Sequence, residues 1–192
     1  PSSPALSSCV ASAAASVPLA PGLRRRRRRR RLRVAPLASA ASAVAGLAIG
    51  IGTTALLHCD LVYTADNARF QLPFTQLGLC PEAGSSVWLP NVIGYQRAAQ
   101  YLLLGEAFGA AEALQLGLVN QVVPAPELLA LAQQKALKLA SLPADAVQSS
   151  KALLKRQHKT LTLETIAAEL VQFQRLLNSA ECQTRIAAFF QR

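Results

Sequence analysis

Residues that bind metals or form disulfide frameworks are scarce in this sequence. The four cysteines lie far apart in the chain, at Cys9, Cys59, Cys80 and Cys182. They form no C-x-x-C pair, and the only histidines are His58 and His158. This spacing matches neither a zinc site nor a disulfide framework. We therefore expect no metal, and we expect the cysteines to be reduced, mostly buried thiols of an intracellular protein.

No acidic residue precedes Asp60, so the basic residues before it give the whole chain its net positive charge. The net charge is +10, from 20 basic and 10 acidic residues. Nine of the basic residues are the run Arg24–Arg31 and Arg33, so the rest of the chain holds 11 basic residues against 10 acidic ones. The remainder is close to neutral and lacks the broad basic face of a DNA-binding domain. We expect no nucleic-acid partner for the folded part.

Residues 1–40 consist mainly of Ala, Ser and Pro around the arginine run. An Arg-rich, Ser-rich segment poor in acids is typical of an organelle transit peptide. The same composition also arises from mistaken translation of GC-rich DNA, and a basic arm that binds nucleic acid is a third interpretation. On each of these interpretations we expect residues 1–40 to be a disordered tail.

A long uncharged stretch, Val34 to Leu57, raises the question of a membrane span. Its 24 residues could cross a bilayer, and it contains Gly46-x-x-x-Gly50 behind a basic flank. Most of its residues, however, are Ala, Ser, Gly and Thr, which insert weakly into membranes. The stretch also continues directly into a strand-like segment. We do not favour a membrane span.

From Ala45 onward the pattern is that of an α/β protein, with a core over residues 45–124 and helices over 125–192. A glycine-rich turn at 50–52 precedes a short helix that opens at Thr53 or Thr54 and ends near His58. The β-branched and aromatic residues that follow predict strands over 60–65, 67–73 and 118–123. Helices are predicted over 94–104, 110–116, 127–142, 144–157, 163–177 and from 180 onward. His58 lies in an apolar run and is interpreted as a core histidine rather than a catalyst.

One carboxylate, Glu82, lies in an apolar segment that reads QLPFTQLGLCPEAGSSVWLP. Asp66 is the only other acid between Leu61 and Gly105. A carboxylate among apolar neighbours loses hydration and therefore takes up and returns a proton more readily near neutral pH. Gly84 and the two serines after it predict the start of a helix. Glu82 is either a general base or a solvated glutamate in a turn.

From about Ala45 to Arg192 the sequence resembles the enoyl-CoA hydratase/isomerase (crotonase) superfamily. The matching motifs are AGLAIGIGTT, HCDLVYTADNARFQLPF, LGLCPEAGSS, LP-x-x-x-G, LLLGEAF-x-AAEALQLGLVNQVVP and SSKALLK. They occur in family order over roughly three quarters of the chain. The resemblance implies an α/β fold, namely a partial crotonase-like spiral of ββα turns followed by C-terminal helices. We expect residues 41–192 to form this domain.

The resemblance also assigns catalytic roles. Hydratases of the family use two glutamates, and the corresponding positions here are Thr54 and Phe74, so the pair needed to add water is missing. A glutamate in the segment P-E-x-G-x-[ST], here Glu82, resembles the base of peroxisomal-type Δ3,Δ2-enoyl-CoA isomerases. The backbone N–H of Ile51 corresponds to one of the two oxyanion-hole donors. A 1,3-proton shift needs only one base, which agrees with this inventory.

The implied substrate is an acyl-CoA thioester, with no further cofactor. The residues expected to contact it are Ala48, Gly50, Gly52, Phe74, Leu77, Pro81 and Arg192. The strands that precede residue 45 in the family fold, and the S-x-G-x-D segment that supplies the second oxyanion donor, are missing from the sequence. We therefore expect low activity, an unpaired sheet edge and exposed apolar surface. Family members are usually trimers or dimers of trimers, so a homo-oligomer is expected if the fold is complete.

Several alternatives stay open at this point. The chain could instead be a hydratase, a non-catalytic remnant that binds partners through its C-terminal helices, or a membrane-anchored or RNA-associated protein that uses residues 24–57. The compartment depends on the N-terminal segment. A transit peptide implies a mitochondrion or another organelle, the isomerase resemblance implies a peroxisome, and a mistranslated segment implies the cytoplasm.

Overall fold

The structure is a computed structural model that describes residues 41–191. The predicted tail, residues 1–40, and the substrate contact predicted for Arg192 lie outside the described residues.

Two small three-stranded sheets form the centre of the described chain. The strands are β1 Ala41–Val44, β2 Leu47–Ile49, β3 Leu61–Ala65, β4 Arg69–Gln71, β5 Phe108–Gly109 and β6 Gln121–Val123. One sheet has the order β1-β3-β6 and is parallel throughout. The other has the order β2-β4-β5, with β2 parallel and β5 antiparallel to β4. The first four strands thus alternate between the two sheets, and helices connect the strands, which confirms the predicted α/β class.

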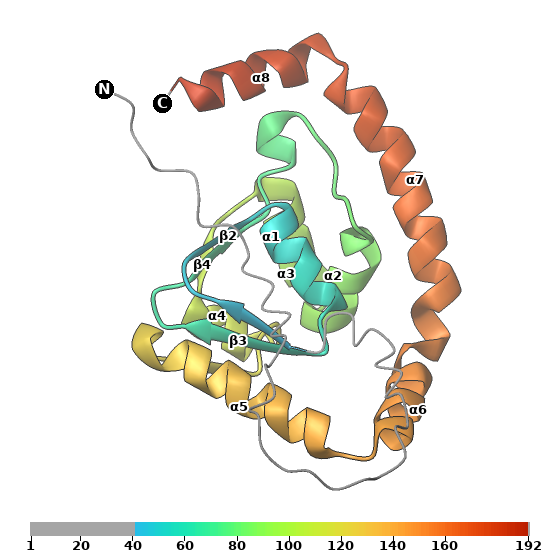
Figure 1. Cartoon of the computed structure of the whole chain (residues 1–192). Coiled ribbons are helices and arrows are strands. Elements are labelled where there is room, and N and C mark those ends of the chain that lie inside the picture. The colour runs from blue at the N-terminus through green and yellow to red at the C-terminus, as the bar shows by residue number, and fades with distance from the viewer. Residues whose placement is uncertain (1–40, 192) are drawn as a thin grey trace, which may run out of the picture.

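Helices fill the connections and surround the sheets (Figure 1). In chain order they are α1 Ile51–Thr54, η1 Ala55–His58, η2 Thr75–Leu77, α2 Ser85–Ile93, α3 Tyr95–Ala99, the π-helix η3 Gln100–Leu104, α4 Ala110–Gln115, η4 Ala125–Glu127, α5 Leu128–Ser141, α6 Ala144–Lys155, η5 Arg156–His158, α7 Lys159–Leu177 and α8 Ala180–Phe190. Helix α5 packs against β1 and β3, and α7 packs against α2. Helices α6, α7 and α8 form an arc around the outside of the core (Figure 1).

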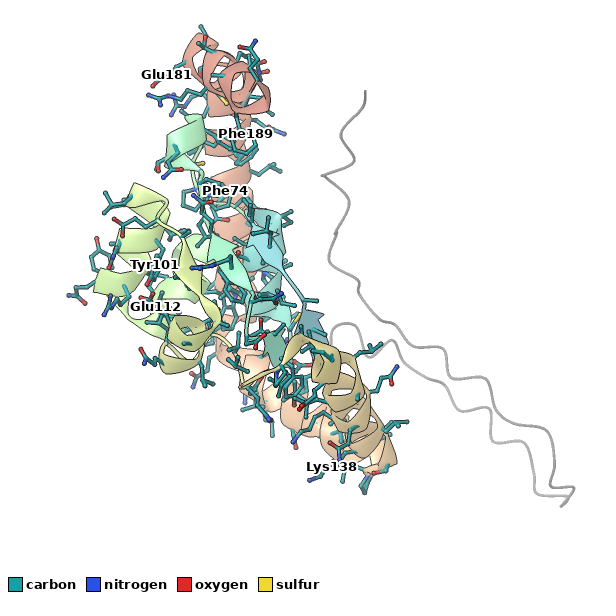
Figure 2. The ribbon with its side chains drawn as sticks, turned by 90° about the vertical axis from the view of Figure 1, so that its left-hand side faces the viewer. Phe74, Tyr101, Glu112, Lys138, Glu181 and Phe189 are labelled. Atoms are coloured by element: carbon teal, nitrogen blue, oxygen red, sulfur yellow. The ribbon has the colours of Figure 1, made fainter. Side chains whose placement is uncertain are left out.

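The core lies between the second sheet and the helices that follow it. Phe70, Leu72 and Leu89 are fully buried, and Phe70 stacks on Phe108 with ring centroids 5.4 Å apart. The ring centroid of Tyr101 lies 4.3 Å from that of Phe108, and the Tyr101 hydroxyl donates a hydrogen bond to Glu112 (Figure 2). Burial of these large side chains is the main stabilising contribution in a core of this size.

The stretch that raised the question of a membrane span folds as short elements. Residues 41–58 form β1, β2, α1 and η1 in turn, because the glycines at 46 and 50 interrupt any regular helix. Within residues 41–191, no helix has both the length and the apolar character to cross a bilayer. Strand β1 lies in an Ala/Ser segment that the sequence pattern does not identify as a strand.

Two helix predictions are wrong in detail. The helix expected over 94–104 divides into α3 and the π-helix η3, which ends at Gly105 in a left-handed conformation. In α7 the helical spacing of Ile166, Leu170, Phe173 and Leu177 predicts one apolar face, but Leu170 is 52 % exposed. The buried residue at this level of α7 is instead Glu169.

Candidate active site

The glycine turn places the start of α1 at the end of β2. Gly50 has a φ of +57° and a ψ of −118°, which an L-residue rarely adopts. Its N–H donates to the Gln71 carbonyl at 2.9 Å, and its own carbonyl accepts from the N–H groups of Thr53 and Thr54. The turn thus reverses the chain so that helix α1 begins at Ile51, two to three residues before the predicted start.

The backbone amides of Ile51 and Gly52 lie at the first turn of α1. The first N–H groups of a helix lack intrahelical acceptors. Within residues 41–191, neither of these two amides has a hydrogen-bond acceptor. Ala48, in β2, is buried and fixes the turn by accepting a hydrogen bond from the Thr53 hydroxyl at 2.5 Å. The Ile51 amide is therefore available to an incoming hydrogen-bond acceptor.

Phe74 lies beside this turn. It is 5 % exposed, and a Cβ atom built on Gly50 would lie 4.0 Å from its Cε1 atom. Of the other predicted contact residues, Gly52 is buried, whereas Leu77 in η2 and Pro81 are half-buried. The turn residues and Phe74 are thus brought together, while no hydrogen bond links Leu77 or Pro81 to Glu82.

The Glu82 carboxylate contacts the other end of α1. It is half-buried and accepts a hydrogen bond from the Thr54 hydroxyl at 2.5 Å, and Thr54 itself is fully buried. Thr54 follows Ile51 by three residues, about 4.5 Å along a helix axis. One short helix therefore holds both the free amide and the partner of the carboxylate. Asp66, the other acid of this region, is exposed.

The residues after Glu82 adopt an unusual backbone. Ala83 has a φ of +57° and is the only non-glycine residue with positive φ in the described chain, and Gly84 follows with +74°. His58 Nε2 donates to the Ala83 carbonyl at 2.7 Å, so this histidine is satisfied by the loop. A strained, anchored backbone of this kind is typical of functional sites.

Glu169, from α7, holds the same loop from the other side. Its carboxylate accepts from the Gly84 N–H at 2.6 Å, the Ser86 N–H at 2.9 Å and the Ser86 hydroxyl at 2.5 Å. Helix α2 therefore begins at Ser85 without a side-chain cap from its own serines. The predicted helix start at these residues is confirmed, but the carboxylate of a distant residue, rather than a serine side chain, accepts from its first N–H groups.

The sequence does not predict two contributors to this site. Thr54 is expected only as a helix start and as the position of an absent glutamate, and Glu169 is not identified. A signal for Glu169 was present, because it lies three residues after Ile166 and four before Phe173, within the apolar stripe of α7. An acid on such a stripe indicates a buried partner.

The side chains of this site include one carboxylate hydrogen-bonded to α1, while Thr54 and Phe74 carry no basic group. Glu82 is the carboxylate that lies next to α1. No group of three or more His, Cys, Asp or Glu side chains in residues 41–191 could hold a metal ion.

Comparison with known proteins places this geometry in a family. The family profile described as enoyl-CoA hydratase/isomerase matches residues 30–192. Among curated relatives, the 2,3-dehydroadipyl-CoA hydratase of Escherichia coli is 35 % identical over 149 residues, and the enoyl-CoA delta isomerase 2 of Rattus norvegicus is 34 % identical over 149 residues. Each alignment covers 78 % of this chain. One of these relatives is named a hydratase and the other an isomerase, at nearly equal identity.

Solved structures agree. The crystal structure of an enoyl-CoA hydratase/isomerase from Pseudoalteromonas atlantica is 43 % identical, with a TM-score of 0.76, over 78 % of this chain and 60 % of that one. The described chain spans 58 % of the length of the Escherichia coli hydratase and 38 % of that of the rat isomerase. The partial crotonase-like fold with C-terminal helices is thus confirmed. The chain belongs to the enoyl-CoA hydratase/isomerase (crotonase) family.

Proposed function

We propose that this protein is an enoyl-CoA isomerase that moves a double bond by proton transfer through Glu82. The observation that supports this assignment is the hydrogen bond that the Thr54 hydroxyl donates to Glu82. It holds the half-buried carboxylate against helix α1, whose first residue carries the free Ile51 amide. The substrate class follows from the family, whose named relatives act on acyl-CoA thioesters or carry enoyl-CoA in their names.

In the proposed reaction, the Glu82 carboxylate removes a proton from C2 of a 3-enoyl-CoA. The electron pair of that C–H bond forms a C1–C2 double bond, and the carbonyl π electrons move onto the thioester oxygen, which gives a dienolate that keeps its C3–C4 double bond. The protonated Glu82 then donates its proton to C4: the C3–C4 π electrons form the new C4–H bond, the C1–C2 electrons form the C2–C3 double bond, and the carbonyl re-forms. This yields the 2-enoyl-CoA and restores the carboxylate. One base therefore completes the cycle, with no net gain or loss of atoms.

The Ile51 N–H is the proposed donor to the thioester oxygen. A hydrogen bond to a developing oxyanion is worth on the order of 3 kcal/mol in transition-state stabilisation. Gly50 fixes the direction of this amide, since its backbone starts the helix. The Thr54 hydroxyl keeps Glu82 in one position, and the buried Phe74 ring lies next to the turn.

The test is product analysis with purified protein and a 3-enoyl-CoA. We expect conversion to the 2-enoyl-CoA, and we expect Glu82→Gln to lower the rate by about 10²–10⁴-fold, the range for loss of a general base. Asp66→Asn is the matched control, because it neutralises an exposed acid of the same region and leaves the rate unchanged. Turnover by the Glu82→Gln protein at the wild-type rate would disprove the assignment, as would a folded wild-type protein with no turnover.

A further inference from the structure

We infer that Glu169 is a positioning residue that fixes the loop bearing Glu82, so that helix α7 sets the placement of the base. This inference rests on the proposed function, in which Glu82 is the base. Glu169 itself contacts no reacting atom. It acts through residues 83–86, which follow Glu82 directly in the chain.

The contacts of Glu169 are concentrated on that backbone. Both carboxylate oxygens are used: one accepts from the Gly84 N–H, and the other accepts from both the N–H and the hydroxyl of Ser86. The loop is also closed on itself, because the Ser85 N–H donates to the Glu82 carbonyl at 3.0 Å. A displacement of Gly84 or Ser86 would therefore move the backbone of Glu82.

Backbone strain explains why the loop needs an external anchor. Ala83 and Gly84 have consecutive positive φ angles, and the alanine conformation is unfavourable for a residue with a Cβ atom. Such a conformation persists only where surrounding contacts determine it. His58 fixes the Ala83 carbonyl on one side, and Glu169 fixes the amides of Gly84 and Ser86 on the other.

The burial of Glu169 shows that its charge is compensated at this place. Its exposed fraction is 8 %, and a buried carboxylate is unfavourable unless it is hydrogen-bonded. Among residues 41–191, none of the ion pairs includes it. Its partners are instead N–H groups at the start of α2, where a helix favours a negative charge. The loop and the carboxylate thus stabilise each other.

Docking of α7 on α2 does not depend on Glu169 alone. The Trp88 Nε1–H donates to the Thr162 hydroxyl at 2.9 Å, and the Trp88 ring lies 4.9 Å from that of His158. A Cβ atom built on Gly84 would lie 3.5 Å from the Thr162 methyl group, so Thr162 borders the loop. Its hydroxyl, however, bonds to Trp88 and to the His158 carbonyl and to none of the loop amides. Thr162 therefore provides a matched control for a role that is merely structural.

The experiment compares Glu169→Gln, Glu169→Asp and Thr162→Val in the full chain. Thr162→Val keeps the branched shape of the side chain and removes its hydroxyl. We expect Glu169→Gln to lower kcat at least tenfold with KM changed less than threefold, and Glu169→Asp to restore part of the loss. Thr162→Val should lower the unfolding midpoint while kcat stays within twofold. Equal effects of Glu169→Gln and Thr162→Val on kcat, at equal loss of stability, would overturn the inference.

A second readout does not depend on turnover. In protein with ¹³C-labelled glutamate, the δ-carbon resonance of Glu82 is identified by its loss in Glu82→Gln. We expect Glu169→Gln to shift or broaden this resonance and to raise amide exchange of Gly84 and Ser86 at least tenfold, with no such change in Thr162→Val. An unchanged Glu82 resonance in folded Glu169→Gln protein would overturn the inference. Absence of wild-type turnover together with the expected shift would instead contradict only the proposed function.

Discussion

At the scale of single residues, the conformation of Gly50 determines where the Ile51 amide points. A side chain at Gly50 would meet no close contact, since the nearest atom lies 4.0 Å away, so the restriction comes from the backbone angles. We predict that Gly50→Ala lowers the free energy of unfolding by about 1–3 kcal/mol. Activity should fall as well, because relief of the strain would rotate the amide.

Urea unfolding of Gly50→Ala and Gly46→Ala measures this effect. Gly46 is the matched control, since an added Cβ atom there would meet nothing within 4 Å and its φ is not positive. We expect the Gly46 variant to stay within about 0.5 kcal/mol of wild type. Equal stability of the two variants would contradict the strain argument.

Tyr101 gives a prediction about pH. Burial, with the hydrogen bond to Glu112 and the charge of that residue, raises the pKa of Tyr101 to about 12, from about 10 in an unfolded chain (Figure 2). As the pH rises, the unfolded chain therefore loses this proton before the folded chain does. The contribution of Tyr101 to the free energy of unfolding is complete below pH 10 and is lost between pH 10 and 12.

Unfolding midpoints measured from pH 9 to 12 test this prediction. Tyr101→Phe should reduce the loss of stability over that interval, because the phenylalanine has no proton to release. Tyr95→Phe is the control, since Tyr95 is 71 % exposed, and it should leave the wild-type pH profile in place. An identical slope in the Tyr101→Phe protein would show that other groups cause the loss.

At the scale of elements, α6 is tied to the start of β3 by a small charge cluster. Lys151 Nζ lies 2.5 Å and Lys155 Nζ 3.0 Å from the two oxygens of Asp60, and Lys155 also donates to the His58 carbonyl at 3.0 Å. The Asp60 side chain is 22 % exposed, so solvent weakens these pairs only in part. The cluster therefore links α6 to the histidine that holds the Glu82 loop.

We predict that Asp60→Asn lowers the free energy of unfolding by about 1 kcal/mol and increases amide exchange along α6. Hydrogen exchange followed by mass spectrometry measures this. Glu181→Gln is the control, because its pair with Arg185 is exposed and lies within one helix, and it should change stability by less than about 0.5 kcal/mol. Unchanged exchange in α6 after Asp60→Asn would mean that apolar contacts alone dock this helix.

How far the sequence predicts these elements depends on the kind of signal each one leaves. The strands at β3 and β4 and the helices from α5 onward are predicted to within a few residues, because β-branched runs, prolines and glycines mark their limits. Strand β1 leaves no such signal in its Ala/Ser segment. The π-helix η3 is also missed, since its apolar pattern matches that of an ordinary helix.

The candidate site shows the same division. Glu82, Ile51 and the glycine turn follow from short motifs that are continuous in the sequence. The contacts of Thr54 and Glu169 join residues that are 28 and 83 to 85 positions apart, so only the folded chain reveals them. The positive φ of Ala83 is likewise a tertiary effect, because alanine itself does not favour that conformation.

At the scale of the whole molecule, β1 and β2 are edge strands of the two described sheets. Leu47 and Ile49 of β2 are 63 % and 41 % exposed, and exposed apolar edge strands promote pairing with other chains. We predict concentration-dependent self-association that the double substitution Leu47→Lys and Ile49→Lys reduces. Sedimentation velocity measures it, with Leu129→Lys on α5, at a position 56 % exposed, as the control. Association that persists in the edge variant would place the interface elsewhere.

The central claim is that this site transfers a proton and does not add water. The direct measurement is incubation of wild-type and Glu82→Gln protein with 3-enoyl-CoA and 2-enoyl-CoA in H₂¹⁸O, with mass spectrometry of the products. We predict interconversion of the two enoyl-CoA isomers by wild type, loss of that interconversion in Glu82→Gln, and no ¹⁸O in any acyl chain. Formation of ¹⁸O-labelled 3-hydroxyacyl-CoA by the wild-type protein would contradict it.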